Sequence, residues 1–239
     1  MGRNWLIMPN INASKYGIAT GQMSTTFSTA RTTAGSYSNQ PSTSNSLATE
    51  YFRDSGKGST NYRFRRFFLA FDVSAYASGY EISGLQLNWR STTSTQNITN
   101  GAIIVKSTAQ GNADTNLSGT DFYDAVDYST AYSSAFTWAD ANADTSVSLN
   151  SNAISQFSNS YLKLVMISKV YDYDNSSGVS DIVVKGQVNI SGTGGFVPYI
   201  SFNAVASGYD NNVTGVDSDA IDNVITVASA DIDNVIGVQ

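Results

Sequence analysis

The sequence contains no cysteine and no histidine, and it has only 3 prolines and two glutamates, Glu50 and Glu81, among 239 residues. Without cysteine or histidine there is no disulfide framework, no thiolate nucleophile and no Ser-His-Asp triad, and the usual ligands of zinc, haem and iron–sulfur centres are missing. A carboxylate pair of the glycosidase kind has few glutamates to draw on, and no aspartate pair stands out. We therefore predict that the protein is not an enzyme and has no catalytic residues and no cofactor.

Charge is scarce and unevenly spread along the chain. Residues 1–107 carry 10 Lys and Arg against 4 Asp and Glu, whereas residues 108–239 carry 3 against 15, and the whole chain has a formal charge of −6. The pI near 4.4 makes nucleic acid a poor candidate partner. Two interpretations stay open: interleaved strands average the charge in space, or a basic end docks on an acidic partner while the acidic end faces solvent.

Hydrophobic alternation predicts short β-strands. The run Tyr62–Val73, YRFRRFFLAFDV, is apolar on nearly both faces, which is typical of a strand in the middle of a sheet. In EISGLQLNWR, which starts at Glu81, Gly84 interrupts the alternation as a β-bulge would. The segment SNAISQFS predicts one or two helical turns with Ser151 or Asn152 as the cap. Strands separated by Gly, Asn, Asp and Ser turns, with little helix, predict an all-β fold: an antiparallel, jelly-roll-like β-sandwich.

The region before this predicted sandwich is rich in Ser, Thr, Gly, Ala and Asn. Such a composition is typical of a segment that is disordered alone or lies as irregular strand against a partner. We therefore assign residues 1–60 to an extended N-terminal arm or edge segment and residues 61–207 to the sandwich. The arm begins with the apolar stretch WLIM, which is too short for a signal peptide or a membrane span, so we expect neither secretion nor a membrane. The residues that we expect to dock on an assembly are Trp5, Leu6 and Ile7.

Residues 208–239 form a short C-terminal tail with an 11-residue repeat, which reads NNVTGVDSDAI, DNVITVASADI and DNVIGVQ. Such a period also suits a right-handed helical supercoil, but Val, Ile, Thr and Gly are poor helix formers, so we favour turns and short strands. So few copies cannot bury their own apolar side chains, so we predict a homo-oligomer, with a trimer favoured. The alternative is a tail that packs on its own sandwich or on a neighbouring protein. The valines that align in the repeat are Val213, Val216, Val224, Val227, Val235 and Val238.

Aspartate and asparagine gather in two loops whose oxygens suit a calcium ion. Asp140, Asn142 and Asp144 have the D-x-N-x-D spacing that starts a calcium loop, although this loop lacks the later glycine and glutamate of an EF-hand. Asp172 and Asp174 lie in the second loop. The alternative is that both loops are solvated turns with side-chain-to-backbone hydrogen bonds.

Four segments in order resemble a known family. RFFLAFDVSAY is an aromatic strand that ends in phenylalanine–aspartate, YEISGLQLNW follows after a loop, a capping helix precedes YLKLVMI, and GGFVPYISFNAV closes the domain. Over about residues 60–205 this pattern resembles the DNRLRE-type jelly-roll domains, and Pro198 matches their closing strand. Such domains are similar in shape to carbohydrate-binding modules and recur in bacterial surface proteins and in virion proteins of marine phages. The tail resembles the closing segments of phage structural proteins.

This resemblance implies a place in a virion. We expect a structural protein of a tailed bacteriophage, exposed on the particle as a head decoration, a head fibre or a tail-fibre component, with itself and other virion proteins as partners. The alternative is a carbohydrate-binding adhesin module of a bacterial surface, or a phage receptor-binding protein, with cell-surface glycans as partners. In that alternative, exposed aromatic faces stack on sugar rings; otherwise they anchor a core or an interface. The aromatic candidates are Trp89, Trp138, Tyr171 and Tyr173.

Overall fold

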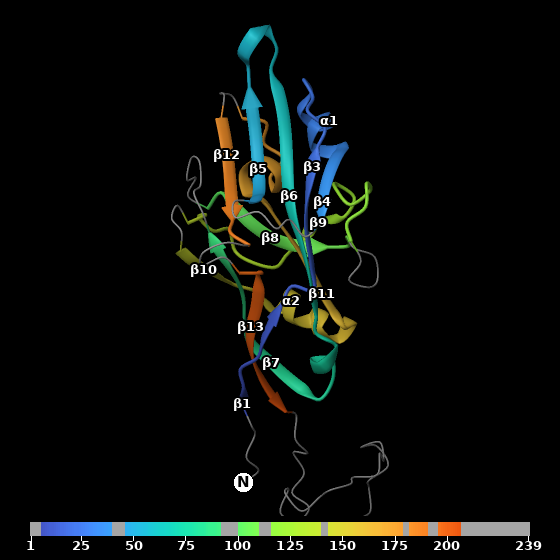
Figure 1. The fold of residues 1–239 in the computed structure, drawn as a ribbon, viewed down its shortest axis with the longest axis vertical. Helices are drawn as coiled ribbons and strands as arrows, with labels where there is room; N and C mark the ends of the chain where they lie inside the picture. The colour runs from blue at the N-terminus through green and yellow to red at the C-terminus, as the bar shows by residue number, and fades with distance from the viewer. Residues whose placement is uncertain are drawn as a thin grey trace, which may run out of the picture.

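The structure, a computed structural model, describes residues 6–39, 46–91, 100–109, 116–139, 143–178, 182–190 and 196–206. These ranges form a mostly antiparallel β-sheet folded into a sandwich, which confirms the predicted all-β class (Figure 1). Among the described residues, no helix combines the length and the apolar character that crossing a lipid bilayer requires. Trp5, Asp140, Asn142 and the whole tail of residues 208–239 lie outside the described residues.

The strands are β1 (Leu6–Ile7), β2 (Asn10–Asn12), β3 (Lys15–Gly21), β4 (Ala34–Asn39), β5 (Ser46–Asp54), β6 (Asn61–Asp72), β7 (Tyr80–Ser91), β8 (Ala102–Ser107), β9 (Val126–Ala131), β10 (Ala143–Ser148), β11 (Tyr161–Ser168), β12 (Ile182–Val188) and β13 (Tyr199–Ala206). The α-helices are α1 (Phe27–Thr32) and α2 (Ser151–Ile154). Short 3-10 turns are η1 (Gly56–Gly58), η2 (Ser74–Tyr76) and η3 (Ser155–Asn159), and η4 (Lys169–Tyr173) is a single π-helical turn.

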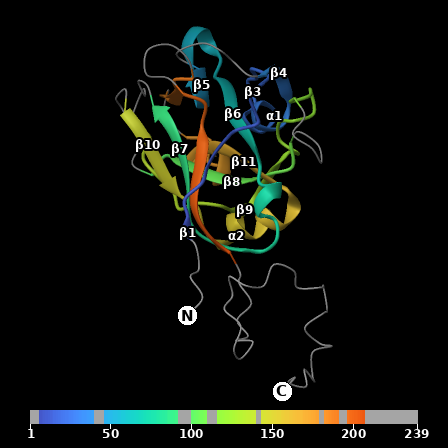
Figure 2. The ribbon, with the colours of Figure 1, turned by 60° about the horizontal axis from the view of Figure 1, so that its bottom comes forward.

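The strands form two layers that are joined at one point. In the first layer, β13 pairs with β7, β1 and β2 pair with β13, and β10 pairs with β7. The second layer runs β12-β5-β6-β11-β8-β9, and β3 pairs with β6 and β4 with β3. Among the described strands, one register pair, Val188 with Ser91, connects the two layers. Figure 2 shows the orange strand β13 passing in front of β8 and β11, with β7 and β10 beside it. Side chains of β7 and β13 share one hydrophobic core with those of β6 and β11, so the apolar faces of the layers meet inside the molecule.

Strand β6 separates two hydrophobic cores. One face carries Phe67, Leu69 and Phe71, which pack against side chains of β7, β11 and β13 between the layers. The opposite face carries Phe64 and Phe68, which pack in a second core with α1, β8 and the residue 116–126 segment. All five side chains are fully buried. The run that is apolar on both faces is therefore a central strand, as predicted, because each face has its own apolar layer to cover it.

The prediction of a separate N-terminal arm is wrong for the described part of residues 1–60. Strand β3 pairs with β6 over six positions, and β5 pairs with β6 and β12. The small residues that suggested a loose segment are needed for packing: a side chain at Gly17 would overlap Leu117, and one at Gly21 would crowd Phe122. The segment is thus an integral part of the sandwich, and its backbone groups find partners within the chain.

Two local predictions are confirmed in form. Gly84 has a left-handed φ of 62°, and the β7–β13 register shifts opposite it, between Ser201 and Asn203, as a bulge requires. The predicted helical turns are α2 and η3, but the cap is one residue earlier than expected. The side chain of Asn150 accepts hydrogen bonds from the backbone N–H groups of Asn152 and Ala153, so Asn150 is the N-cap.

Packing at Gly186 in β12 provides a test of the inter-layer core. Gly186 is buried directly under the Trp138 ring, which lies 5.3 Å from the Trp89 ring between centroids. Gly186→Ala would place a methyl group inside that ring, so we expect it to lower the free energy of unfolding by about 1–3 kcal/mol. Gly119→Ala is the control, because Gly119 is exposed with an open approach and should change stability by less than about 0.5 kcal/mol. Urea unfolding measures both, and equal stability of the two variants would contradict the packing.

Candidate functional site

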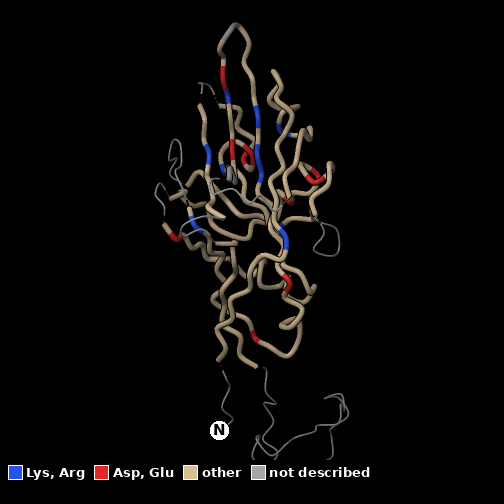
Figure 3. The backbone as a smooth tube through the Cα atoms, viewed as in Figure 1, with Lys and Arg blue, Asp and Glu red and all other residues tan. Residues whose placement is uncertain are grey.

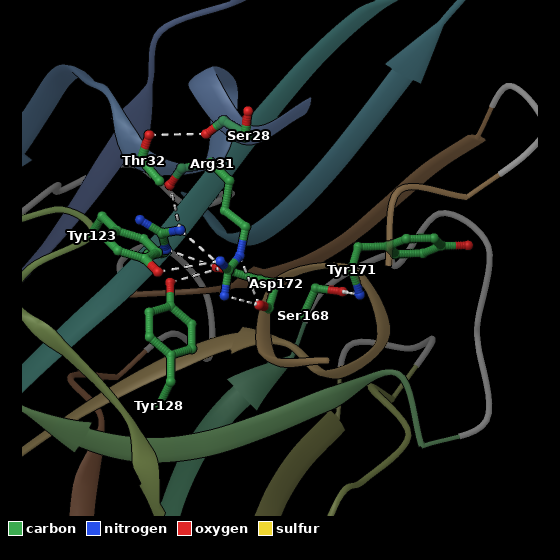
Figure 4. Close-up of polar contacts among 9 residues, drawn as sticks. Ser28, Arg31, Thr32, Tyr123, Tyr128, Ser168, Tyr171 and Asp172 are labelled. Carbon is green, nitrogen blue, oxygen red and sulfur yellow. Dashed lines mark hydrogen bonds and ion pairs between the residues drawn. The ribbon is translucent and has the colours of Figure 1, made fainter. Parts of the chain in front are cut away.

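The most concentrated group of buried charges joins four separate elements. Arg66 of β6 is 0% exposed and Asp172 of η4 is 1% exposed. Arg66 Nε donates to Asp172 Oδ2 at 2.7 Å and Arg66 Nη2 donates to Oδ1 at 2.9 Å, so the pair is bidentate. Tyr128 of β9 donates its hydroxyl to Oδ1 at 2.9 Å, and Arg31 of α1 donates to the Asp172 carbonyl at 2.6 Å through Nη2 (Figure 4).

Aromatic rings complete this cluster. The Arg66 guanidinium lies 3.9 Å from the centroid of Phe122, and the Arg31 guanidinium lies 4.5 Å from that of Tyr128. Burial is the largest single influence and lowers the pKa of Arg66, but the charge and hydrogen bonds of Asp172 together with the neighbouring Tyr128 and Tyr123 outweigh it, so the pKa lies above its ordinary value. Burial, together with Asp172, raises the pKa of Tyr128. Both groups therefore keep their protons at neutral pH.

The geometry gives this cluster a structural role. Both oxygens of Asp172 are bonded to Arg66, and the side chain is almost wholly out of contact with solvent. A general acid or base has to reach a substrate proton, and this carboxylate reaches only protein groups. The cluster joins β6 to η4, α1 and β9, and Asp172 has no part in a calcium site.

The other described aspartates that were predicted as calcium ligands, Asp174 and Asp144, also form ion pairs with basic side chains of the protein. Asp174 receives the Lys169 ammonium at 2.6 Å, and Asp144 receives Arg90 Nη1 at 2.8 Å. Asp172 and Asp174 thus pair with different basic side chains, Arg66 and Lys169, and their carboxylates do not converge on a common metal position. Within the described ranges, no group of three or more Asp, Glu, His or Cys side chains is arranged to hold a metal ion.

The aromatic residues considered for sugar stacking are mostly inside the molecule. Trp89 is 0% exposed and Trp138 is 5% exposed, and both belong to the inter-layer core. Tyr171 stacks on Tyr51 with ring centroids 3.9 Å apart. Tyr173 lies under the Lys169 ammonium, 5.1 Å from the ring centroid. The interpretation of these rings as core anchors therefore holds for the two tryptophans.

A more accessible feature lies along the outer side of β13. We call it the β1–β2 edge, meaning residues 6–12 together with the segment 196–199. Leu6 is 58% exposed, Ile7 42% and Met8 75%, so three consecutive large apolar side chains face outward. Next to them, a groove of about 310 Å³ is lined by two asparagines and three half-buried apolar or aromatic residues. These are Asn10, Asn12, Phe196, Val197 and Tyr199.

The charge and backbone of this edge indicate how it can make contact. Strands β1, β2 and β13 contain no charged residue, and the charged residue next to them in register is Glu81 of β7, which pairs with Val205 (Figure 3 shows the acidic residues in red). Strands β1 and β2 are only two and three residues long and are separated by Pro9. Short edge strands and proline oppose the addition of a further strand. The edge is therefore suited to burial of side chains against a partner.

The structure brings together part of what the sequence predicts for assembly. Leu6 pairs with Val205 and Ile7 with Ala204, so two predicted docking residues lie beside the end of β13. The repeat tail begins directly after this strand, although its valines lie outside the described residues. Sequence reasoning missed Phe196, Val197 and Tyr199, which it treated only as part of a closing strand. The apolar and aromatic residues on both sides of Pro198 were the available signal.

Comparison with known proteins adds no family. No protein-family model matches this chain, and a search of curated proteins finds no significant match. The resemblance to DNRLRE-type domains therefore stays a prediction.

The buried pair can be tested against a neighbouring surface pair. Asp172→Asn removes the charge that compensates Arg66 and leaves a buried cation, so we expect it to lower the free energy of unfolding by about 3–5 kcal/mol. Asp174→Asn is the matched control, because its partner Lys169 is partly exposed and the cost should stay below about 1 kcal/mol. Chemical denaturation of both variants gives the comparison. Similar losses in the two variants would show that Asp172 does not have this role.

Proposed function

We propose that this chain is a structural protein of a bacteriophage virion, exposed on the particle surface as a head decoration, a head fibre or a tail-fibre component. The proposal rests on the sequence resemblance and on a fold whose buried charges serve packing. Its partners are then other virion proteins and further copies of the chain. An adhesin module of a bacterial surface is the alternative.

One observation carries the assembly part of this proposal. The exposed apolar residues Leu6, Ile7 and Met8 lie at the same edge as the end of β13, from which the repeat tail continues. The N-terminal strand β1 and the end of β13, which come from opposite ends of the chain, thus lie side by side at one edge of the sandwich. A surface whose outer strands are apolar or neutral, and which lies next to an extension of over thirty residues, is suited to holding the domain on a larger assembly.

The charge distribution supports the same division of the chain. Residues 1–206 carry 13 Lys and Arg and 13 Asp and Glu, so the sandwich region is neutral. Residues 207–239 carry six Asp and no Lys or Arg, and therefore hold the whole formal charge of −6. The basic and acidic halves of the sequence largely average out within the sandwich, while the tail keeps its charge. In such a tail, the rows of valines can make contacts with a partner, and the aspartates can remain in solvent.

Incorporation into particles tests the role of the β1–β2 edge. Particles that lack the gene product are complemented with the wild-type chain, with Ile7→Asp or with the control Met23→Asp, which changes a residue of similar exposure elsewhere. A buried aspartate costs far more than an exposed one, so we expect Ile7→Asp to lower incorporation about tenfold or more and Met23→Asp to leave it unchanged. Mass spectrometry and electron microscopy of purified particles measure how much of each variant is incorporated. Particles with the same composition with and without the gene product would contradict the virion proposal itself.

The oligomer is tested by removing the tail. At about 25 cal/mol per Å² of apolar surface, a single short repeat cannot offset ordering costs on the order of 1–2 kcal/mol per residue. We therefore propose that tails associate, with a trimer favoured, and expect light scattering to give a trimer for the full chain and a monomer for a chain that ends at Gly208. Val224→Asp should act like the truncation. A monomer for both lengths would refute self-association.

A further inference from the structure

Three cations gather on one face of strands β5, β6 and β12. Glu50 pairs in register with Lys185 on one side and with Arg65 on the other, so these three side chains share a face of the sheet. Arg63, two residues before Arg65, lies on the same face. We call this group, together with Phe52 opposite Arg63, the cationic face. Figure 3 shows Lys and Arg in blue along these strands.

One carboxylate in the middle of this face has to compensate all three cations. Glu50 Oε1 accepts a hydrogen bond from Arg63 Nε at 2.7 Å, but the same oxygen lies 3.7 Å from Arg65 Nε, which is too long for a hydrogen bond. Lys185 forms no ion pair with another described residue. Asp54, the other acid on this face, lies nearer the turn η1 and bonds to its backbone. The cationic face therefore keeps an excess of positive charge.

The surroundings of Arg65 show the same excess. Its Nε atom is buried and makes no hydrogen bond to a described residue. Burial, the largest influence, lowers the pKa of Arg65, Glu50 raises it and Arg63 lowers it further, so the pKa lies below its ordinary value. A guanidinium nevertheless stays charged at neutral pH. A further carboxylate placed on this face would therefore be stabilising.

The cationic face is accessible and has an apolar row beside its charges. The side chains of Arg63 and Arg65 are 26% and 23% exposed, and Lys185 is half-buried. In Figure 1, this part of β5, β6 and β12 lies above β7 and β13, so the strands of the first layer leave it uncovered. Val183 pairs with Phe52, and the Arg63 guanidinium lies 5.2 Å from the centroid of the Phe52 ring. A partner that suits this face has acidic and apolar groups next to each other.

The tail of residues 207–239 has this composition. It carries six Asp and no Lys or Arg, whereas the charges of residues 1–206 sum to zero. An aspartate directly follows a branched apolar residue three times, as Val216–Asp217, Ile221–Asp222 and Ile232–Asp233. Arginine binds carboxylates through two parallel hydrogen bonds, so such aspartates are suitable partners for Arg63 and Arg65. A nucleic acid would need a larger basic surface than three cations around one carboxylate.

We propose that the cationic face binds the acidic tail of a neighbouring copy of this chain. Strand β13, from which the tail continues, ends at the bottom of Figure 1, whereas the turn between β5 and β6 lies at the top. The start of the tail and the cationic face thus lie toward opposite ends of the longest axis, which favours contact between copies over contact within one. Head-to-tail contacts of this kind close into a ring, such as a trimer, when the rotation between copies allows it. The inference rests on the proposed self-association and is independent of a place in a virion.

Carbodiimide cross-linking of the full chain tests the contact, because it joins a lysine to a carboxylate that lies within ion-pair distance. Isotope-labelled and unlabelled chains are mixed in equal amounts in urea and refolded together. We expect mass spectrometry to find Lys185 joined to a tail aspartate, with about half of these products containing one labelled and one unlabelled peptide, and a yield that falls severalfold in high salt. Absence of such products overturns the proposal, and so do products that always join two peptides of the same label.

Charge reversal separates this contact from the association of the valine rows. Lys185→Glu should weaken self-association of the full chain about tenfold at low salt and much less at high salt, and Lys185→Gln, which places no like charge beside Glu50, about threefold. Lys15→Glu is the matched control, because Lys15 is a half-buried strand lysine that pairs with Ala70 on the other face of the sheet. Light scattering over a range of concentrations measures all of them. Association of both Lys185 variants equal to that of the wild type overturns the docking, whereas a full chain that is monomeric throughout refutes self-association as well.

Discussion

The bidentate pair of Arg66 and Asp172 is the interaction on which the arrangement of the second layer depends. Strand β5 pairs with Asn61–Arg65 of β6, and β11 pairs with Phe67–Asp72, so Arg66 falls between these two pairings, while it pairs with Ala19 of β3. Its guanidinium points into the second core, where an uncompensated charge would be very costly. Asp172 supplies the compensation from η4, the turn that directly follows β11. The position of η4, and through Arg31 that of α1, is thereby tied to one residue of the central strand.

A buried ion pair is seldom more stabilising than an apolar pair of the same volume, so its main effect here is on specificity. A slip of one residue in β6 would turn Arg66 to the opposite face and bring Arg65 or Phe67 into the second core. With Arg66 fixed, Phe64 and Phe68 face the second core and Phe67, Leu69 and Phe71 the first. The charge thus selects the register, and the aromatic residues on either side supply most of the apolar burial.

Much of this fold follows from the sequence, and the failures have physical causes. Local patterns predicted the central strand, the Gly84 bulge and the turns after Leu149, because each depends on residues close in sequence. The N-terminal region was misjudged because Gly17 and Gly21 have a purpose only once Leu117 and Phe122 cover them. A stretch rich in small residues is equally compatible with a loose arm and with a strand that packs closely against bulky side chains. Asp172 in turn looked like a calcium ligand, because its partner Arg66 is 106 positions away.

The candidate surfaces show the same limit. Leu6 and Ile7 were predicted from a short apolar stretch, but their place beside β13 depends on a pairing nearly two hundred residues along the chain. The cationic face carries no motif, because Glu50, Arg65 and Lys185 come from three strands and meet only through the register. What distinguishes it is one carboxylate among three cations, which is a property of the strand pairing. A sandwich that satisfies its most deeply buried charges internally leaves its contacts with other molecules to surfaces that are neutral or incompletely compensated, so contacts at the cationic face depend on salt and those at the β1–β2 edge on apolar burial.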